Sequence, residues 1–477
     1  MLCATISGPS FKEAQQQILH SLPFVDSIEL RIDYLLSLSE EEIHELIILA
    51  KHPILTLKRL AHTPQEVWVQ QVMNLARLQP EYLDIDYTFP KEALNHIRKY
   101  YPKIKILLSF HSDTYEHLPT IYKNLAQTPA HEYKLAISPR NSLETFHCLQ
   151  YKNHLPENTT LLCMGEVGIP SRILSPLIKN KKNYTAAPYS SPVAPGQLPL
   201  KELLTYNYAN LSEKSQIYGL IGNPIDRSIS HISHNQLFAN LHLSASYIKI
   251  LLEFHELEAF ISLSRELPFR GLSVTTPFKT EIINYIDVLD PSVHQCQACN
   301  TLVFKNNTLI GYNTDGLGMI HLLNAKGISL KNSRLGIVGA GGAAKAIALA
   351  CAHAGANISI FNRSSTPGIQ LANLCGGSFF PLNELSPTQG IDILILCLPP
   401  NTPFPEIFPP IILDINTLPK ESTYTKKAKH RGCYILYGYE LFAQQALLQF
   451  ALWLPTPLSQ HQHDEFLIHI ENIMHSV

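Results

Sequence analysis

Eight short runs of apolar or β-branched residues recur roughly every 25 residues through the first 205 residues of the chain. The runs are LCATIS, SIELRIDYL, PILTLK, YLDIDY, KILLSFH, EYKLAIS, TLLCMG and NYTAAPY. Amphipathic helical stretches such as SEEEIHELIILAK and PQEVWVQQVMNLARL separate them. Because eight βα units are the number that closes a ring of parallel strands, this part is predicted to be an α/β fold, a (β/α)8 TIM barrel.

The chain is too long for the barrel alone. Its 477 residues exceed what one hydrophobic core normally organises, so further domains are expected. The segment SSPVAPGQLPLKELLTYNYANLSEKS is rich in proline and polar residues, and a new apolar strand begins at IYGLIG, which puts a boundary near residue 212. The two parts are therefore expected to join through a short connection.

Charge and composition restrict the kind of partner. The formal net charge of -2 leaves no broad basic field for nucleic acid or an anionic membrane, and no apolar run is long enough to span a bilayer. Small-molecule substrates are therefore the expected partners, and nothing in the sequence specifies an oligomeric state. The N-terminus lacks the pattern of a signal peptide, and nine cysteines are too few and odd in number for a disulfide framework, so a cytoplasmic location is expected.

No metal site is predicted. Cys296 and Cys299 form a CxxC motif without a second ligand pair, and we interpret them as ordinary thiols. Four histidines near the C-terminus fall on a stretch interpreted as a polar, solvated helix. They are His461, His463, His469 and His475.

Charged residues lie within or just after the predicted barrel strands, where such barrels carry their chemistry. Glu29, Arg31 and Asp33 alternate along the second run, a spacing that predicts one shared face. Charges facing a barrel interior are costly unless they serve a ligand. The other such residues are Lys58 and Arg59 at the end of the third run, Asp84 and Asp86 in the fourth, His111 in the fifth and Lys134 in the sixth.

Lys134 is a candidate Schiff-base lysine. It lies between apolar residues of a strand, where burial disfavours the charged amine, so we expect a lowered pKa and a neutral nucleophile. A protonated imine would acidify the carbon beside it, and His111 from the adjacent strand could move that proton. Each residue alone also fits an ordinary interpretation, an ion-paired lysine and a structural histidine; their combination favours catalysis.

The motifs IELRID, LLSFH, YKLAI, MGEVGIPSR and APGQ, in this order, resemble the type I 3-dehydroquinate dehydratases, a (β/α)8 family that forms an imine with its substrate. The resemblance covers nearly all of residues 1–205. It implies that Lys134 is the imine lysine and His111 the general acid and base. The residues that it implies for holding the substrate are Glu29, Arg31, Lys58, Arg172 and Gln197.

Two departures from that family affect the expected site. In LKRLAHTPQE, Lys58 stands where the family has an arginine, and His62 stands where it has a glutamate that partners the histidine. Glu29 and Asp86 are the possible substitute partners. Val193 replaces a serine ahead of APGQ, which removes one expected substrate contact.

A dinucleotide-binding motif lies in the second half of the chain. RLGIVGAGGAAKAIALACAHAGANISIFNRSS is a strand, a glycine turn, a helix and another strand, and Gly339, Gly341 and Ala344 fit GxGxxG/A. Such glycines let a pyrophosphate approach backbone amides at a helix N-terminus, here with Gly342 and Ala343.

The end of the following strand predicts which dinucleotide binds. Asn362 and Arg363 stand where an NAD enzyme usually carries an acidic residue for the ribose hydroxyl. An arginine there favours a 2′-phosphate, so NADP is the predicted cofactor. The alternative is a surface arginine that merely ends a strand.

The motifs IGNPIDRSISHISHN, LSVTTPFK, QACNTL, GYNTDGLG and GYELFAQQALLQFALW resemble shikimate dehydrogenase across residues 217 to about 455. This resemblance implies that Lys279 and Asp315 form the catalytic pair; without it they would read as a solvated lysine and a turn or cap residue. The implied substrate contacts are Ser228 and Ser230 for the carboxylate and Thr275, Asn300 and Gln445 for the ring hydroxyls. His231 and the segment LCLPPNTP depart from the family's usual residues.

The two resemblances imply four segments: a barrel over 1–210, a substrate-binding domain over 217–325, a Rossmann-type NADP domain over 326–436 and a returning helical segment over 437–477. They imply a bifunctional shikimate-pathway enzyme that dehydrates 3-dehydroquinate and reduces the product to shikimate with NADPH. A dehydrogenase half that prefers quinate, or a catalytically silent metabolite sensor, are the alternatives. The four catalytic candidates speak against a sensor.

Overall fold

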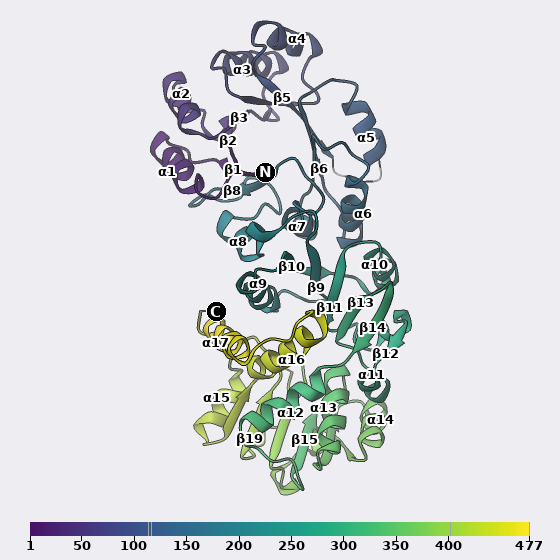
Figure 1. The fold of residues 1–477 in the computed structure, drawn as a ribbon. Helices are drawn as coiled ribbons and strands as arrows, with labels where there is room; N and C mark the ends of the chain where they lie inside the picture. Colours follow the sequence, from purple (N-terminus) through teal and green to yellow (C-terminus); the bar gives the residue numbers. More distant parts are fainter. Residues whose placement is uncertain (113, 116, 401, 477) are drawn as a thin grey trace. The chain divides into compact units, whose positions relative to one another are not determined.

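The computed structural model describes residues 1–112, 114–115, 117–400 and 402–476. The chain divides into two units (Figure 1). The first comprises Met1–Gln216 with Phe238–Ile250, and the second comprises Ile217–Leu237 with Leu251–Val477. Within the described part of the chain, no helix combines the length and the apolar character needed to cross a membrane.

The first unit contains the predicted barrel. Its eight strands form one sheet in the order β7-β6-β5-β4-β3-β2-β1-β8, with every paired neighbour parallel. The strands are β1 (Leu2–Ile6), β2 (Ser27–Arg31), β3 (Pro53–Thr56), β4 (Tyr82–Asp86), β5 (Lys105–Ser112), β6 (Glu132–Ile137), β7 (Thr159–Cys163) and β8 (Asn183–Ala186). Lys181 N donates to Thr159 O at 3.5 Å where β7 and β8 approach each other. The barrel is therefore nearly closed, and the predicted fold is confirmed.

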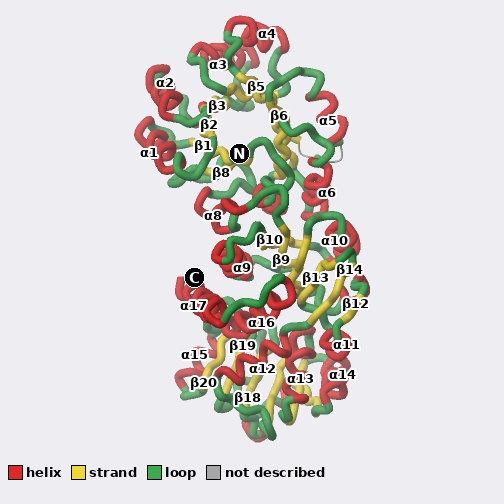
Figure 2. Tube along the Cα trace, viewed as in Figure 1, coloured by secondary structure: helices red, strands yellow, loops and turns green. Residues whose placement is uncertain are grey.

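Helices surround these strands, which lie inside the ring in Figure 2. They are α1 (Phe11–Ser21), α2 (Glu40–Leu49), α3 (Gln65–Arg77), α4 (Lys91–Tyr100), α5 (Leu118–Leu125), α6 (Ser142–Lys152), α7 (Ile169–Ile173) and α8 (Leu200–Thr205). Two of them begin with reciprocal capping boxes, Ser10 with Glu13 and Ser39 with Glu42. The helices bury an apolar side against the sheet, as Ile18 does from α1.

Two strand ends differ from the sequence-based expectation. β2 stops at Arg31 and a 3-10 turn, Ile32–Tyr34, follows, so the expected shared strand face is wrong for Asp33. The backbone turns there because Asp33 folds back to bind the Arg31 guanidinium through two hydrogen bonds. β3 stops at Thr56, which leaves Lys58 in the loop beyond the strand.

The first sheet of the second unit contains β9, β11, β13, β14 and β12, in this order. The helices and strands between residues 216 and 325 are β9 (Gln216–Gly222), α9 (Ser230–Asn240), β10 (Ala245–Leu251), α10 (Leu257–Ser264), β11 (Phe269–Val274), β12 (Val288–Leu289), α11 (Pro291–Cys296), β13 (Thr301–Lys305), β14 (Thr308–Tyr312) and α12 (Asp315–Ala325). β9 and β11 are parallel, whereas β13 is antiparallel to both of its neighbours.

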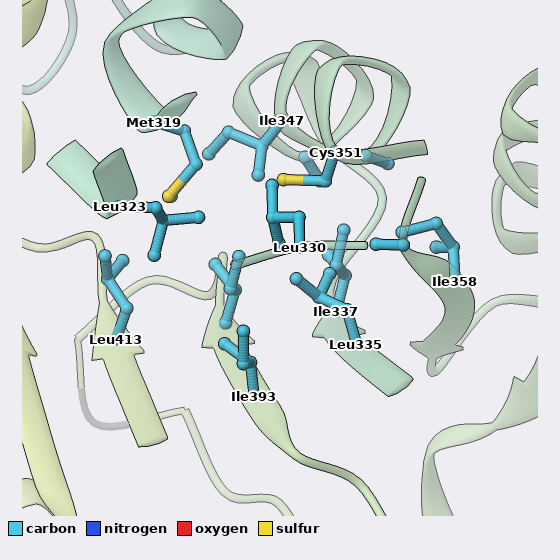
Figure 3. Packing of buried hydrophobic residues seen from close by; sticks show 14 of the residues in the cluster. Met319, Leu323, Leu330, Leu335, Ile337, Ile347, Cys351, Ile358, Ile393 and Leu413 are labelled. Atoms are coloured by element: carbon cyan, nitrogen blue, oxygen red, sulfur yellow. The ribbon is translucent and has the colours of Figure 1, made fainter. Parts of the chain in front are cut away.

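The second sheet is parallel throughout, in the order β17-β16-β15-β18-β19-β20, the strand order of a Rossmann fold. Its elements are β15 (Arg334–Val338), α13 (Gly342–His353), β16 (Asn357–Asn362), α14 (Ser365–Cys375), β17 (Ser378–Pro381), β18 (Ile393–Leu396), β19 (Ile411–Asp414), α15 (Thr423–His430) and β20 (Tyr434–Tyr437). Figure 3 shows Met319 and Leu323 of α12 and Ile347 of α13 packed over Ile337 and Ile393 of the sheet.

Two helices, α16 (Gly438–Trp453) and α17 (Gln460–Ser476), end the chain. α16 packs on α12 and β13, where Trp453 Nε1 donates to Leu302 O at 3.0 Å. α17 buries an apolar side that includes Phe466 and Ile470. The stretch is therefore an amphipathic helix with one packed side rather than a uniformly polar one, and His461 and His475 lie on its exposed side.

Candidate active sites

Lys134 lies in a buried charged cluster inside the barrel. Its Nζ donates to Asp84 Oδ2 from β4, which is separated from β6 by β5, lies 3.7 Å from Glu29 Oε1, and is 4.7 Å from the centroid of the Tyr184 ring. Only 6% of Lys134 is exposed. The alternation of strand residues directs Asp84, Glu29 and Lys134 to the barrel interior together. We call Lys134, Asp84 and Glu29 the lysine cluster.

The lysine cluster corrects the expected charge state. Burial by itself lowers the pKa of Lys134, but the charges of Asp84 and Glu29 outweigh it and hold that pKa above its ordinary value. Burial raises the pKa of Asp84, yet Lys134 lowers it more, and the net pKa lies below the ordinary one. The expectation of a neutral amine is therefore wrong for the free enzyme, because the Lys134 amine faces two carboxylates inside the barrel.

Hydroxyl groups hold Glu29 and connect it to Gln197. Thr5 Oγ1 and Thr56 Oγ1 each donate to a different Glu29 oxygen at 2.8 Å. Gln197 Nε2 donates to Thr5 Oγ1 at 3.1 Å, and its Oε1 accepts from Val193 N at 2.9 Å. Two predicted substrate contacts therefore lie in one hydrogen-bond network, which fixes their orientation.

His111 lies between a cation and a carboxylate. Its Nε2 is 3.2 Å from Lys58 Nζ, and its Nδ1 is 3.9 Å from Asp86 Oδ2. Burial, then the charges of Lys58 and Lys134, lower the pKa of His111 to about 4, so the ring is neutral at pH 7. Of the two possible substitutes for the missing glutamate, Asp86 is the one that the described residues place at ion-pair distance.

The two predicted substrate arginines differ in availability. Arg31 is engaged by Asp33 through Nε at 2.9 Å and Nη2 at 2.6 Å. Arg172 is 3% exposed, its Nε has no hydrogen-bond partner among the described residues, and its Nη2 donates only to Pro195 O at 3.4 Å. Burial lowers the pKa of Arg172 to about 10. A buried guanidinium with so few partners is suited to a substrate carboxylate.

The APGQ glycine closes the loop beside Arg172. Gly196 has a φ of +70°, and a Cβ there would lie 2.2 Å from Gly165 O. Both the backbone conformation and the close approach require glycine. The loop thereby holds Pro195 and Gln197 at the barrel mouth.

Lys279 and Asp315 form the predicted pair in the second unit. Lys279 Nζ donates to Asp315 Oδ2 at 2.6 Å, and Asn300 Nδ2 donates to Asp315 Oδ1 at 2.8 Å. Asp315 N donates to Asn313 Oδ1 at 3.0 Å at the start of α12. The Lys279 side chain is 17% exposed, so its amine is held by the carboxylate and still reaches solvent.

The other predicted substrate residues belong to the same unit as this pair. Ser228 Oγ and Ser230 Oγ are 2.7 Å apart. Thr275 follows β11, and its N donates to Ile221 O at 3.0 Å. Gln445 lies on α16 beside Gly318 of α12, where a Cβ would come within 3.2 Å of the Gln445 backbone.

The glycine loop lies directly beside Lys279. Gly339 has a φ of +113°, and a Cβ there would meet Cys397 O at 2.5 Å. A Cβ on Gly342 would meet Lys279 Cβ at 2.9 Å, whereas a Cβ on Gly341 would project into open space at the N-terminus of α13. Ala343 continues that first turn. The residues thus leave room for a dinucleotide pyrophosphate next to the lysine.

The predicted 2′-phosphate residues lie at the end of β16. Asn362 Nδ2 donates to Ser364 O at 2.8 Å, and Arg363 is exposed. The departing segment LCLPPNTP includes Asn401, which lies outside the described residues. Among the described residues no group of histidine, cysteine, aspartate and glutamate side chains could hold a metal ion.

Several site residues were not assigned roles from sequence. They are Asp84, Thr5, Thr56, Tyr184 and Asn313. Asp84 could have been identified from the sequence, because it alternates with Asp86 in an otherwise apolar strand. The two threonines carried none, since threonine is common in strands.

The chain joins two enzymes. The first is a barrel with a lysine cluster in its interior, and the second is a Rossmann-type unit with a lysine–carboxylate pair beside its glycine loop. Residues 2–212 match the family described as type I 3-dehydroquinase, and residues 220–302 match the shikimate dehydrogenase substrate binding domain. The chain is 51% identical to the shikimate biosynthesis protein AroDE of Chlamydia pneumoniae over 100% of both chains. It belongs to this family and is a bifunctional type I 3-dehydroquinase and shikimate dehydrogenase.

Two further relatives have the same organisation in whole or in part. The bifunctional 3-dehydroquinate dehydratase/shikimate dehydrogenase of Arabidopsis thaliana is 27% identical over 96% of this chain and 83% of its own. The shikimate dehydrogenase (NADP(+)) of Bacillus cereus strain AH820 is 34% identical over 50% of this chain and 92% of its own.

Proposed function

We propose that the barrel dehydrates 3-dehydroquinate through an imine at Lys134, and that the second unit reduces the resulting 3-dehydroshikimate with NADPH at Lys279 and Asp315. The observation that carries this proposal is the contrast between the two lysines. Lys134 is buried among carboxylates inside a barrel, whereas Lys279 is paired with one carboxylate beside a dinucleotide loop.

In the barrel, the Lys134 amine attacks the substrate ketone, and loss of water leaves a protonated imine. The iminium withdraws electrons from the adjacent carbon, whose proton His111 removes while it is neutral. The electrons then expel the hydroxyl of the next carbon, and His111 returns its proton to that oxygen. Arg172 binds the substrate carboxylate, and hydrolysis of the imine releases the enone and regenerates Lys134.

In the second unit, bound NADPH supplies a hydride to the ketone carbon. Lys279 donates a proton to the developing alkoxide, and Asp315, held by Asn300, orients the lysine. Ser228 and Ser230 bind the carboxylate, and Thr275, Asn300 and Gln445 bind the ring hydroxyls. The residues proposed to hold the dinucleotide are Gly339, Gly341, Gly342, Ala343, Asn362 and Arg363.

We place the functional domains at 1–210, 217–325, 326–436 and 437–477, and the protein in the cytoplasm. The support for these boundaries is the change from barrel to mixed sheet near β9 and the return of α16 onto β13.

Supplying the purified protein with 3-dehydroquinate and NADPH, without added 3-dehydroshikimate, tests both steps together. One NADPH should be oxidised for each 3-dehydroquinate consumed, with shikimate as the product identified by mass spectrometry. Dehydration without NADPH oxidation would contradict the second activity, and NADPH oxidation only when 3-dehydroshikimate is added directly would contradict the first.

Replacing Gly341 by alanine should weaken NADPH binding without unfolding the protein. The new Cβ has open space and an ordinary backbone conformation, but it projects where the pyrophosphate would approach the amides of α13. We expect KM for NADPH to rise about tenfold or more, with an unchanged melting temperature and unchanged dehydratase activity. An unchanged KM would exclude this loop from the cofactor site.

Replacing Lys58 by methionine should move the acid limb of the dehydratase pH profile upward. Burial lowers the pKa of His111, and the charges of Lys58 and Lys134 lower it further, to about 4. Loss of the Lys58 charge lets the pKa rise, so the neutral base is lost at a higher pH as acid is added, by roughly one pH unit. The measurement is kcat/KM against pH, with exposed Lys103→Met as the matched control. An unmoved limb would show that His111 does not set it.

A further inference from the structure

Lys134 Nζ faces the carboxylate of Asp84, which has no role in the proposed dehydration steps. Asp84 Oδ2 accepts from Nζ, while Asp84 Oδ1 is buried without a hydrogen-bond partner of ordinary geometry among the described residues. Asp84 is 6% exposed. Thr56 Oγ1 is 3.5 Å from Oδ2, and Ser109 is close enough to help lower the pKa of Asp84. Water is thus largely excluded from this carboxylate.

The balance of imine formation explains what such an anion would do. An ammonium and a ketone become an iminium and water, so two protons leave the nitrogen with the carbonyl oxygen, and the single positive charge stays at Nζ. The neutral amine exists only in between. An anion fixed beside Nζ therefore stabilises the nitrogen before and after the bond forms, and a protonated imine is the form that withdraws electrons.

We propose that Asp84 is the counter-ion of the protonated imine on Lys134, and that its carboxylate relays the two protons that leave the nitrogen, one at a time, to the carbinolamine oxygen that departs as water. This inference rests on the proposed imine mechanism and adds a catalytic residue to it. As the lysine cation loses its charge, burial raises the basicity of Asp84, which makes the brief transfer possible.

Other charged or ionisable groups lie near Lys134 Nζ, and their titration also contributes to the pH dependence of dehydration. They are Glu29 and Arg31 of β2, Lys58 beyond β3, His111 of β5, Cys3 of β1 and Tyr184 of β8. Glu29 Oε1, at 3.7 Å, is the only other carboxylate oxygen of the described residues within ion-pair distance of Nζ. Its oxygens already accept from Thr5 and Thr56, which leaves Asp84 as the direct partner.

The test compares Asp84→Asn with Asp84→Glu and with Glu132→Gln. Glu132 pairs with Lys182 in another fully buried ion pair of the same barrel, at the opposite end of β6 from the substrate mouth. Turnover of 3-dehydroquinate is measured against pH, and the adduct on Lys134 is quantified by mass spectrometry after borohydride reduction.

Asp84→Asn should lower turnover by about 10²-fold or more and move the alkaline limb to lower pH, because the iminium loses its proton more easily. Asp84→Glu should recover most of the rate. Glu132→Gln should leave the alkaline limb in place even if it lowers the melting temperature as much. Wild-type or faster turnover in Asp84→Asn would overturn the proposal, because it would mean that the ion pair with Asp84 only slows attack by the Lys134 amine. An alkaline limb at the wild-type pH would overturn it as well.

Trapping with the wild-type enzyme distinguishes failure of the imine mechanism from failure of the proposed role of Asp84. Failure to trap any adduct on Lys134 in the folded wild type would refute the imine mechanism itself, whatever the Asp84 variants do. Should Asp84→Asn fail to fold, Ser109→Ala removes only a hydroxyl that supports the Asp84 charge. It should move the alkaline limb in the same direction by a smaller amount, and an unmoved limb there would contradict the role of Asp84.

Discussion

Replacing Lys134 by arginine should abolish dehydration while leaving the reduction of 3-dehydroshikimate intact. Arginine keeps a positive charge opposite Asp84 and Glu29, so the buried carboxylates stay paired. A guanidinium stays protonated and cannot form the imine. We expect kcat for 3-dehydroquinate to fall by at least about 10⁴-fold, as for loss of a catalytic nucleophile, measured by the absorbance of the enone product.

Lys182→Arg is the matched control for that variant. Lys182 is fully buried and pairs with Glu132 in the same barrel, so it reports the cost of fitting a larger cation into a buried ion pair. Its dehydratase activity should stay within a few-fold of the wild type. Appreciable dehydration by Lys134→Arg, or equal losses in both variants, would contradict the catalytic assignment.

Replacing Lys279 by methionine should have the reciprocal effect. The alkoxide formed by hydride transfer would lose its proton donor, and Asp315 would retain its bond from Asn300. NADPH oxidation by 3-dehydroshikimate should fall by about 10³-fold, the usual range for loss of a general acid, with most of the effect on kcat. Dehydration of 3-dehydroquinate should be unchanged.

Lys345→Met serves as the control for Lys279→Met. Lys345 lies in the first part of α13 and is not assigned to the reaction. Near wild-type turnover is expected for this control. Loss of both activities in Lys279→Met would mean that the two sites do not work independently.

The barrel could be predicted from sequence because its strands are short, apolar and evenly spaced, and because the parallel order follows from eight repeated units. The position of Asp33 could not be predicted in the same way. An alternating pattern predicts a shared strand face, but it contains no information on where a strand ends. Here β2 ends at Arg31, where the guanidinium binds the Asp33 carboxylate two residues later. Lys58 lies beyond β3 for a similar reason.

The charge state of Lys134 could not be predicted from its own strand. The neighbours in sequence are apolar and suggest a lowered pKa, whereas the neighbours in space are carboxylates on β4 and β2, which raise it. The pairing of Lys279 with Asp315 joins residues 36 apart in the chain, and only the motifs linked them beforehand. Local pattern therefore identified the candidate residues, and the tertiary fold decided their charges and partners.

The most direct test of two separate sites in one chain is borohydride reduction in the presence of 3-dehydroquinate. A single adduct should form on Lys134, located by peptide mass spectrometry, and dehydratase activity should be lost in proportion to the adduct. NADPH-dependent reduction of 3-dehydroshikimate should persist in the same trapped protein. A folded protein that gives no adduct on Lys134, or a trapped protein that loses both activities together, would contradict this account.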